Sequence, residues 1–113
     1  MKKRVYKMFV EDILESMNKI ERYIKGVDYE AVAKNEMVVD AIMRNLEIIG
    51  EAATQVSEEL RGNVLGIPWS VIVGMRNRLI HAYFSINLNV VWSTSTEDIP
   101  LLITELKNIL SKG

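Results

Sequence analysis

Hydrophobic residues recur at intervals of three and four through most of this chain, a spacing typical of amphipathic α-helices. The first such stretch covers residues 4–25 and is followed by Gly26, a residue type that commonly ends a helix. Asp28 is then placed to cap a brief helical turn over residues 29–33. The start of the sequence therefore predicts one long helix, a glycine stop and a short capped turn.

The longest helix is predicted to begin after Asn35, a second candidate N-cap, and to run to Leu60. Gly62-Asn63 follows and is expected to end it. Because its hydrophobic positions keep one rhythm throughout, we expect this helix to form the centre of the fold. Its inward-facing positions are Val38, Ile42, Leu46, Ile49, Ala53, Val56 and Leu60.

The second half of the chain predicts two more helices. A third long helix begins near Pro68, which a first turn tolerates. A brief turn of helix is expected over residues 88–92, after which Thr96 caps a last helix with Pro100 in its first turn. No stretch alternates as a strand does. The sequence therefore predicts a single all-α domain over residues 1–113, an antiparallel up-and-down four-helix bundle with short extra helical turns.

The charge balance limits the kind of nucleic-acid contact that the chain can make. Fourteen basic and fifteen acidic residues among 113 give a formal charge of −1. A general nucleic-acid coat protein carries excess positive charge instead. Any contact with RNA must therefore come from a local basic cluster, for which Arg76 and Arg78 are the best candidates.

Two absences in the sequence narrow the chemistry and the location. The chain has no cysteine, which excludes disulfides, thiolate nucleophiles and cysteine-based metal sites. Its apolar runs fall short of the roughly 20 residues that a membrane helix needs. We therefore expect a cytoplasmic protein without a membrane segment.

The strongest chemical signal is the stretch Arg76-Asn77-Arg78-Leu79-Ile80-His81-Ala82-Tyr83. His81 is the only histidine in the chain, and hence the only side chain whose ordinary proton equilibrium lies between pH 5 and 8. Arg76 and Arg78 lie within five positions of His81, and their positive charges favour binding of an anionic phosphate. A proton carrier beside fixed positive charge is what cleavage or transfer at a phosphodiester requires.

A single regular helix cannot bring these groups together. At about 100° per residue, Arg76 and Tyr83 share a face, whereas His81 points roughly 140° away from Arg76. Two explanations remain open. Either the helix ends or bends near His81, or the same segment of a second subunit completes the site. A two-fold dimer would also double the local positive charge.

These residues also have purely structural interpretations. A lone histidine near a helix end is commonly a cap or a half-buried group with a satisfied hydrogen bond, and Arg76 could pair with a carboxylate. The chain would then be a structural dimer, with Arg76 and His81 buried against partners in their own subunit.

Other polar and aromatic residues favour structural roles. Glu47 and Glu51 lie one helical turn apart, but no histidine, cysteine or third carboxylate lies nearby in sequence to complete a metal site. We therefore predict no metal and no other cofactor. Trp69 and Trp92 could stack on bases, yet tryptophans among apolar helical positions more often belong to a core or an interface.

The motif and its surroundings resemble a known family. Arg76-Asn77, three residues and then His81 are similar to the arginine–polar–x3–histidine signature of the HEPN superfamily. With Ala82-Tyr83, they resemble the longer R-x4-H-x-Y form of the HepT ribonuclease toxins. The resemblance covers nearly the whole chain. Its flanking stretches are residues 44–53, Ile67-Pro68-Trp69, Val90-Val91-Trp92 and Asp98-Ile99-Pro100.

The resemblance implies a HEPN-like bundle that dimerises, with two motif copies lining a shared cleft, and a metal-independent endoribonuclease activity. Arg76 would hold and neutralise the scissile phosphate. His81 would act as general base on the ribose 2′-hydroxyl or as general acid on the leaving oxygen. Asn77 would orient these groups by hydrogen bonding, and the product would carry a 2′,3′-cyclic phosphate.

The resemblance also implies a toxin–antitoxin system. The partner would be a minimal nucleotidyltransferase antitoxin, which blocks the toxin by transferring AMP to the motif tyrosine, here Tyr83. A larger assembly of the homodimer with this antitoxin stays open. So does an alternative function, because some HEPN proteins are non-catalytic binding subunits of nucleotidyltransferases. The intact set of Arg76, Asn77 and His81 disfavours that alternative.

Overall fold

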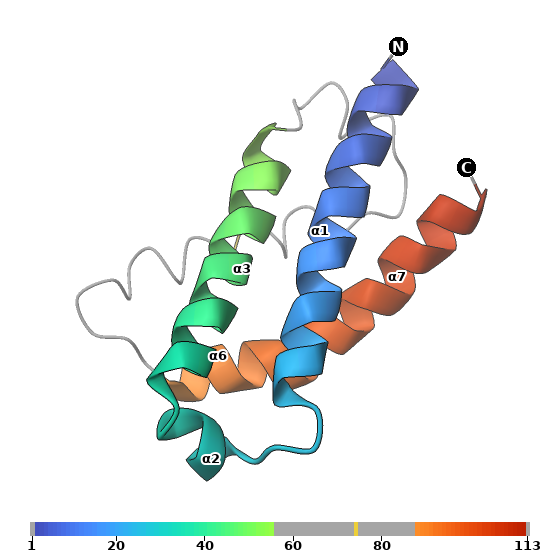
Figure 1. The fold of residues 1–113 in the computed structure, drawn as a ribbon. Coiled ribbons are helices and arrows are strands. Elements are labelled where there is room, and N and C mark those ends of the chain that lie inside the picture. The colour runs from blue at the N-terminus through green and yellow to red at the C-terminus, as the bar shows by residue number, and fades with distance from the viewer. Residues whose placement is uncertain (1, 56–73, 75–87, 113) are drawn as a thin grey trace.

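A computed structural model describes residues 2–55, 74 and 88–112, and every structural statement below concerns that part of the chain. It contains helices and, within these residues, no strand, which confirms the predicted all-α class. The elements are α1 (Lys2–Ile24), α2 (Tyr29–Ala33), α3 (Glu36–Gln55), α6 (Leu88–Ser93), the π-helix η1 (Thr94–Asp98) and α7 (Ile99–Lys112) (Figure 1).

The connection from α1 to α3 follows the predicted signals. Gly26 has a φ of 73°, in the left-handed region that favours glycine, and α1 ends just before it at Ile24. The Asp28 carboxylate accepts a hydrogen bond from the Ala31 amide at 2.9 Å, which caps α2. The Asn35 side-chain oxygen accepts one from the Val38 amide at 3.2 Å, which caps α3. The glycine stop and both N-caps are therefore confirmed.

The core forms where α1 meets its two long neighbours. α1 contacts both α3 and α7, and Figure 1 shows that it runs in the opposite direction to each of them. Full burial of one such aliphatic side chain contributes about 1.5–3 kcal/mol, so this interface supplies much of the driving force for folding. The largest fully buried side chains are Val10, Ile13, Met17, Ile20, Ile42, Leu46, Ile49, Ile99 and Leu106.

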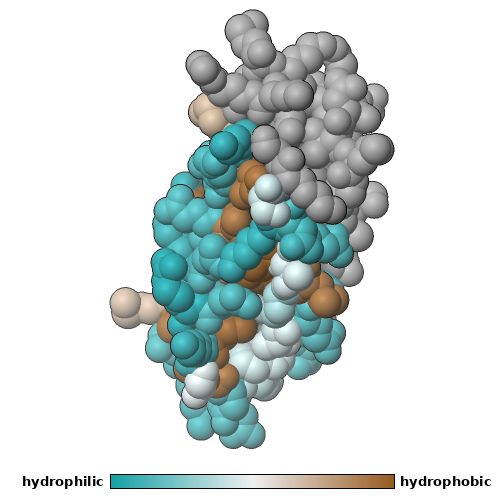
Figure 2. All heavy atoms as spheres, turned by 90° about the vertical axis from the view of Figure 1, so that its right-hand side faces the viewer, coloured by the Kyte–Doolittle hydropathy of each residue, from teal (hydrophilic) through white to brown (hydrophobic). Residues whose placement is uncertain are grey.

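The face of the molecule on which α7 lies is largely hydrophilic, in agreement with the sequence pattern (Figure 2). On the side of the molecule where α7 lies, hydrophobic residues show as a band between hydrophilic ones (Figure 2). Leu101, on the outer face of α7, is an exception and is 68% exposed. Among the described residues, no helix is both long enough and apolar enough to cross a membrane.

Part of the expected bundle lies outside the described residues. The predicted third long helix from Pro68 falls in the undescribed range, as do Leu60 and Gly62-Asn63, the predicted end of α3. Gly74 alone is described there, and its conformation is helical. The four-helix up-and-down arrangement therefore stays a prediction.

The C-terminal part differs from the expected short turn and separate capped helix. Residues 88–112 form one unbroken run of helix. Thr96 does not cap it, because its hydroxyl lies inside η1 and donates to the Trp92 carbonyl at 2.8 Å. The predicted cap is wrong because a threonine hydroxyl can bond a carbonyl one turn earlier in the same helix as readily as it can cap the next one. Pro100 does lie in the first turn of α7, as expected.

Candidate functional site

The five residues of the predicted site lie outside the part of the chain that the structure describes. They are Arg76, Asn77, Arg78, His81 and Tyr83. Their arrangement relative to one another, and the choice between a bent helix and a site shared by two subunits, therefore stay predictions. What the structure does provide is the position of the two helices between which this segment runs.

The described residues of α3 end at Gln55 and, apart from Gly74, the next described residue is Leu88. Leu88 lines the same pocket as Val39, in the first turn of α3. Other residues of this pocket come from α2, so α2, α3 and α6 meet at one end of the molecule (Figure 1).

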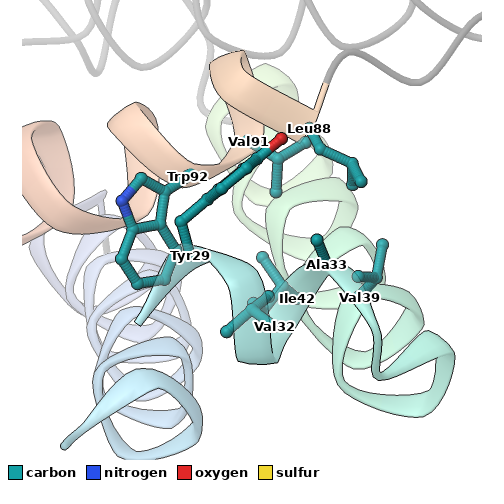
Figure 3. Close-up of a pocket in the computed structure, with 8 residues that line it drawn as sticks. All are labelled: Tyr29, Val32, Ala33, Val39, Ile42, Leu88, Val91 and Trp92. Atoms are coloured by element: carbon teal, nitrogen blue, oxygen red, sulfur yellow. The ribbon is translucent and has the colours of Figure 1, made fainter. Parts of the chain in front are cut away.

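That end of the molecule carries a small apolar pocket (Figure 3). The rings of Tyr29 and Trp92 meet edge to face there, with centroids 6.0 Å apart and planes at 69°. Such pairs contribute about 0.5–1.5 kcal/mol beyond their buried area. The contact favours the packing interpretation of Trp92 over base stacking, whereas Trp69 lies outside the described residues. The pocket is lined by Tyr29, Val32, Ala33, Val39, Ile42, Leu88, Val91 and Trp92.

Glu47 and Glu51 lie on the exposed surface of α3. Glu47 forms an ion pair with Arg44 at 3.7 Å, and both side chains are mostly exposed. Glu51, one turn later, is exposed as well. Within residues 2–55, 74 and 88–112, no cluster of three or more histidine, cysteine, aspartate or glutamate side chains could hold a metal ion. The ion pair with Arg44 agrees with a structural role of Glu47.

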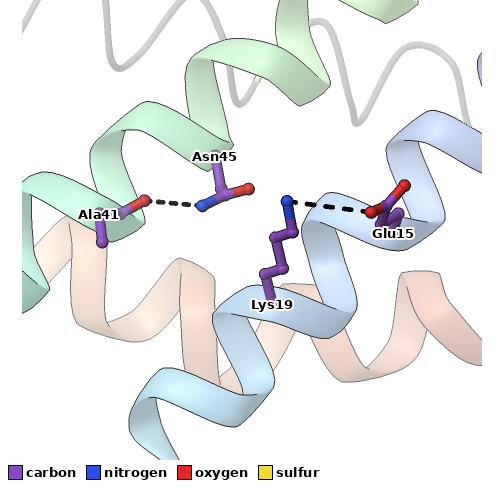
Figure 4. Close-up of polar contacts among 4 residues, drawn as sticks. All are labelled: Glu15, Lys19, Ala41 and Asn45. Atoms are coloured by element: carbon purple, nitrogen blue, oxygen red, sulfur yellow. Dashed lines mark hydrogen bonds and ion pairs between the residues drawn. The ribbon is translucent and has the colours of Figure 1, made fainter.

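Asn45 is a buried polar residue that the hydrophobic pattern did not predict. Asn45 is 5% exposed, and its side-chain nitrogen donates to the Ala41 carbonyl one turn earlier in α3 at 2.9 Å (Figure 4). Figure 4 shows it directed toward α1, where Lys19 pairs with Glu15 at 3.9 Å. A signal was present in the sequence, because Asn45 lies three residues after Ile42 and four before Ile49, on the apolar face of the helix. This amide lies at the interface between α3 and α1.

Comparison with known proteins decides the family. The model of the family described as "Ribonuclease HepT-like" matches residues 13–109, a range that includes the whole motif segment. This chain belongs to the HepT-like ribonuclease family. The predicted family relationship is therefore confirmed.

The similarity to individual relatives extends over almost their full length. The chain is 40% identical to "Putative RNase MJ1380" of Methanocaldococcus jannaschii, over 95% of this chain and 98% of that protein. It is 38% identical to "Putative RNase TTE0752" of Caldanaerobacter subterraneus subsp. tengcongensis, over 92% and 93%. It is also 38% identical to "Probable ribonuclease HepT" of Thermococcus cleftensis, over 88% and 91%. No solved structure matches the chain.

Proposed function

We propose that this HepT-like protein is a metal-independent endoribonuclease that acts as the toxin of a toxin–antitoxin pair in the cytoplasm. One observation carries the proposal. The region matched by the ribonuclease family includes an intact Arg76-Asn77-x3-His81-x-Tyr83 motif. The relatives' names, which describe ribonucleases, support the same reaction class.

The proposed reaction uses the ribose 2′-hydroxyl of the RNA as nucleophile. His81 removes its proton as the oxygen attacks the neighbouring phosphorus, and a 2′,3′-cyclic phosphate forms. The bond from phosphorus to the 5′-oxygen breaks, and that oxygen leaves with a proton from a general acid. Arg76 neutralises the charge that develops on the non-bridging oxygens, and Asn77 orients the reacting groups. No metal is needed, because the nucleophile is already held within the substrate.

A homodimer would account for two features of the sequence. His81 is the only histidine, yet cleavage needs both a proton acceptor and a proton donor. Two copies of His81 in a shared cleft could divide these roles. Two copies of Arg76 and Arg78 would also supply a local positive surface for RNA on a chain with a formal charge of −1. The proposed fold of each subunit is the antiparallel four-helix bundle, with the segment from Pro68 as its remaining long helix.

Regulation would act directly on the motif. In the proposed system, the Tyr83 hydroxyl attacks the α-phosphorus of ATP on a minimal nucleotidyltransferase antitoxin. A bond forms from the tyrosine oxygen to phosphorus, and pyrophosphate leaves. The adenylate adds bulk and negative charge seven residues from Arg76, so it would repel RNA and fill the cleft. A larger complex of the dimer with the antitoxin would hold the two proteins together during this transfer.

Cleavage of RNA in the presence of a chelator tests the enzymatic proposal. The purified protein should produce fragments that end in a 2′,3′-cyclic phosphate, detected by mass spectrometry. His81→Ala and Arg76→Ala should lose this activity, whereas Arg44→Ala should keep it, because Arg44 pairs with Glu47 on the surface of α3. If the wild type cleaves no RNA but binds the co-expressed transferase, the protein is a non-catalytic binding subunit.

Co-expression with the cognate transferase tests the proposal about regulation. Tyr83 should gain the mass of one or more AMP groups, and the modified protein should no longer cleave RNA. Tyr83→Phe should gain no adenylate, whereas Tyr29→Phe should be modified like the wild type, since Tyr29 packs against Trp92 in α6. Adenylate on any other residue would contradict the assignment of Tyr83.

A further inference from the structure

Methionine supplies all the sulfur in this chain. The sequence contains six methionines and no cysteine, so an oxidant that reacts with sulfur can attack only thioether groups. Two of the six, Met1 and Met75, lie outside the described residues. The four whose side chains the structure describes are Met8, Met17, Met37 and Met43.

Burial divides these four thioethers into two groups. Met17 is fully buried, and Met43 is half-buried against the same core. By contrast, Met37 in the first turn of α3 is 82% exposed, and Met8 on α1 is 58% exposed. An exposed thioether reacts with an oxidant directly, whereas a buried one reacts only when the surrounding structure opens. Met37 and Met8 are therefore the accessible sulfur atoms among the described residues.

The surroundings of Met37 suit the oxidised side chain. Oxidation converts the apolar thioether into a polar sulfoxide. In the core, that oxygen would be buried without a hydrogen-bond partner, but at Met37 it stays in water. A partial negative charge is also favourable in the first turn of a helix, for the reason that a carboxylate is. We therefore expect oxidation at Met37 to leave the fold intact.

We propose that Met37 and, second to it, Met8 are sites of reversible oxidation by peroxides, while the core keeps Met17 reduced. A lone pair of the thioether sulfur attacks one oxygen of hydrogen peroxide, so a sulfur–oxygen bond forms and the oxygen–oxygen bond breaks. The second oxygen leaves as hydroxide, takes the proton of the transferred hydroxyl and becomes water. The sulfur loses two electrons, and the peroxide is reduced by the same two electrons. This inference does not depend on cleavage of RNA.

Treatment of the full-length protein with hydrogen peroxide tests the proposal. Trypsin releases residues 8–19 as one peptide, with Met8 and Met17, and residues 35–44 as another, with Met37 and Met43. Tandem mass spectrometry thus compares an exposed and a buried methionine within one peptide. Met17 should gain oxygen more slowly than Met8 by about tenfold or more. In concentrated urea the four rates should become alike, because the fold causes the difference.

Stability and reversal are measured on the oxidised protein. A Met75→Leu background keeps oxidation at this undescribed residue out of the measurement, and leucine replaces methionine with little change in volume. Protein oxidised at Met37 and Met8 should keep its Tm within about 3 °C of the reduced protein. Methionine sulfoxide reductases for both sulfoxide epimers should remove both oxygens from the folded protein.

Met37→Leu is the matched control. It should remove the gain of oxygen at position 37 and leave the rate at Met8 unchanged, because the two residues lie on different helices. Equal rates at Met37 and Met43 in the folded protein, or at Met8 and Met17, would overturn the proposal. So would a sulfoxide at Met37 that unfolds the protein or that the reductases leave in place.

Discussion

The α1–α3 interface and the motif segment distribute polar residues in opposite ways. Where α1 meets α3, the buried positions are aliphatic apart from Ser16 and Asn45. Between Arg76 and Tyr83, five of eight residues are polar or aromatic with a polar tip. The interface therefore supplies stability and the motif supplies the proposed chemistry. If this division is correct, substitutions in the α1–α3 interface should leave the rate of RNA cleavage unchanged. Substitutions in the motif should leave the stability of the fold unchanged.

The largest effect is expected from His81→Ala. Loss of a general acid–base group costs about 10²- to 10⁴-fold in rate, and two copies in one dimeric cleft favour the upper part of this range. The free energy of unfolding should stay within about 0.5 kcal/mol of wild type if the side chain has no structural role. Single-turnover cleavage and urea unfolding measure the two quantities. A large loss of stability with unchanged cleavage would support the structural interpretation of this histidine.

The converse effect is expected from Leu46→Ala in the interface. Leu46 is fully buried in α3, and such a truncation costs about 2–5 kcal/mol of stability. Urea unfolding measures this loss, and the fraction that stays folded should cleave RNA at the wild-type rate. Leu101→Ala is the matched control, because Leu101 is 68% exposed and should lose little. Equal losses in the two variants would contradict the position of the core.

A smaller effect is expected at the cap of α2. Asp28→Ala removes the acceptor of the Ala31 amide and should cost about 1 kcal/mol. Asp40→Ala removes an exposed carboxylate from the body of α3 and should cost no stability. Thermal unfolding distinguishes the two variants. Cleavage should be unchanged in both, because neither lies in the motif.

The smallest effect is expected from Arg44→Ala. Its ion pair with Glu47 is long and mostly exposed, and such pairs contribute at most about 1 kcal/mol. Raising the salt concentration should remove any difference from wild type. A loss of RNA cleavage in this variant would show that the basic groups needed for activity extend beyond the motif onto α3.

Local rules predicted much of the helical structure because the signals act within a few residues. The stop at Gly26 and the caps at Asp28 and Asn35 each depend on one backbone conformation or one hydrogen bond to a neighbouring turn. The cap predicted at Thr96 failed for a reason that is also local, since its hydroxyl had a second acceptor in the Trp92 carbonyl. The candidate site was found from residue types and family resemblance, and its geometry stays a prediction.

The sequence by itself determined the helices within residues 2–55, their apolar faces and the family that the chain resembles, because these depend on residue type and spacing alone. Only the tertiary structure decided that Asn45 lies inside the interface and that residues 88–112 continue as one helix through a π-helical turn. The burial of Asn45 depends on α1 lying against α3, and residues 88–112 contact α1, α2 and α3. These contacts join segments that are far apart in the sequence, so spacing along the chain does not encode them.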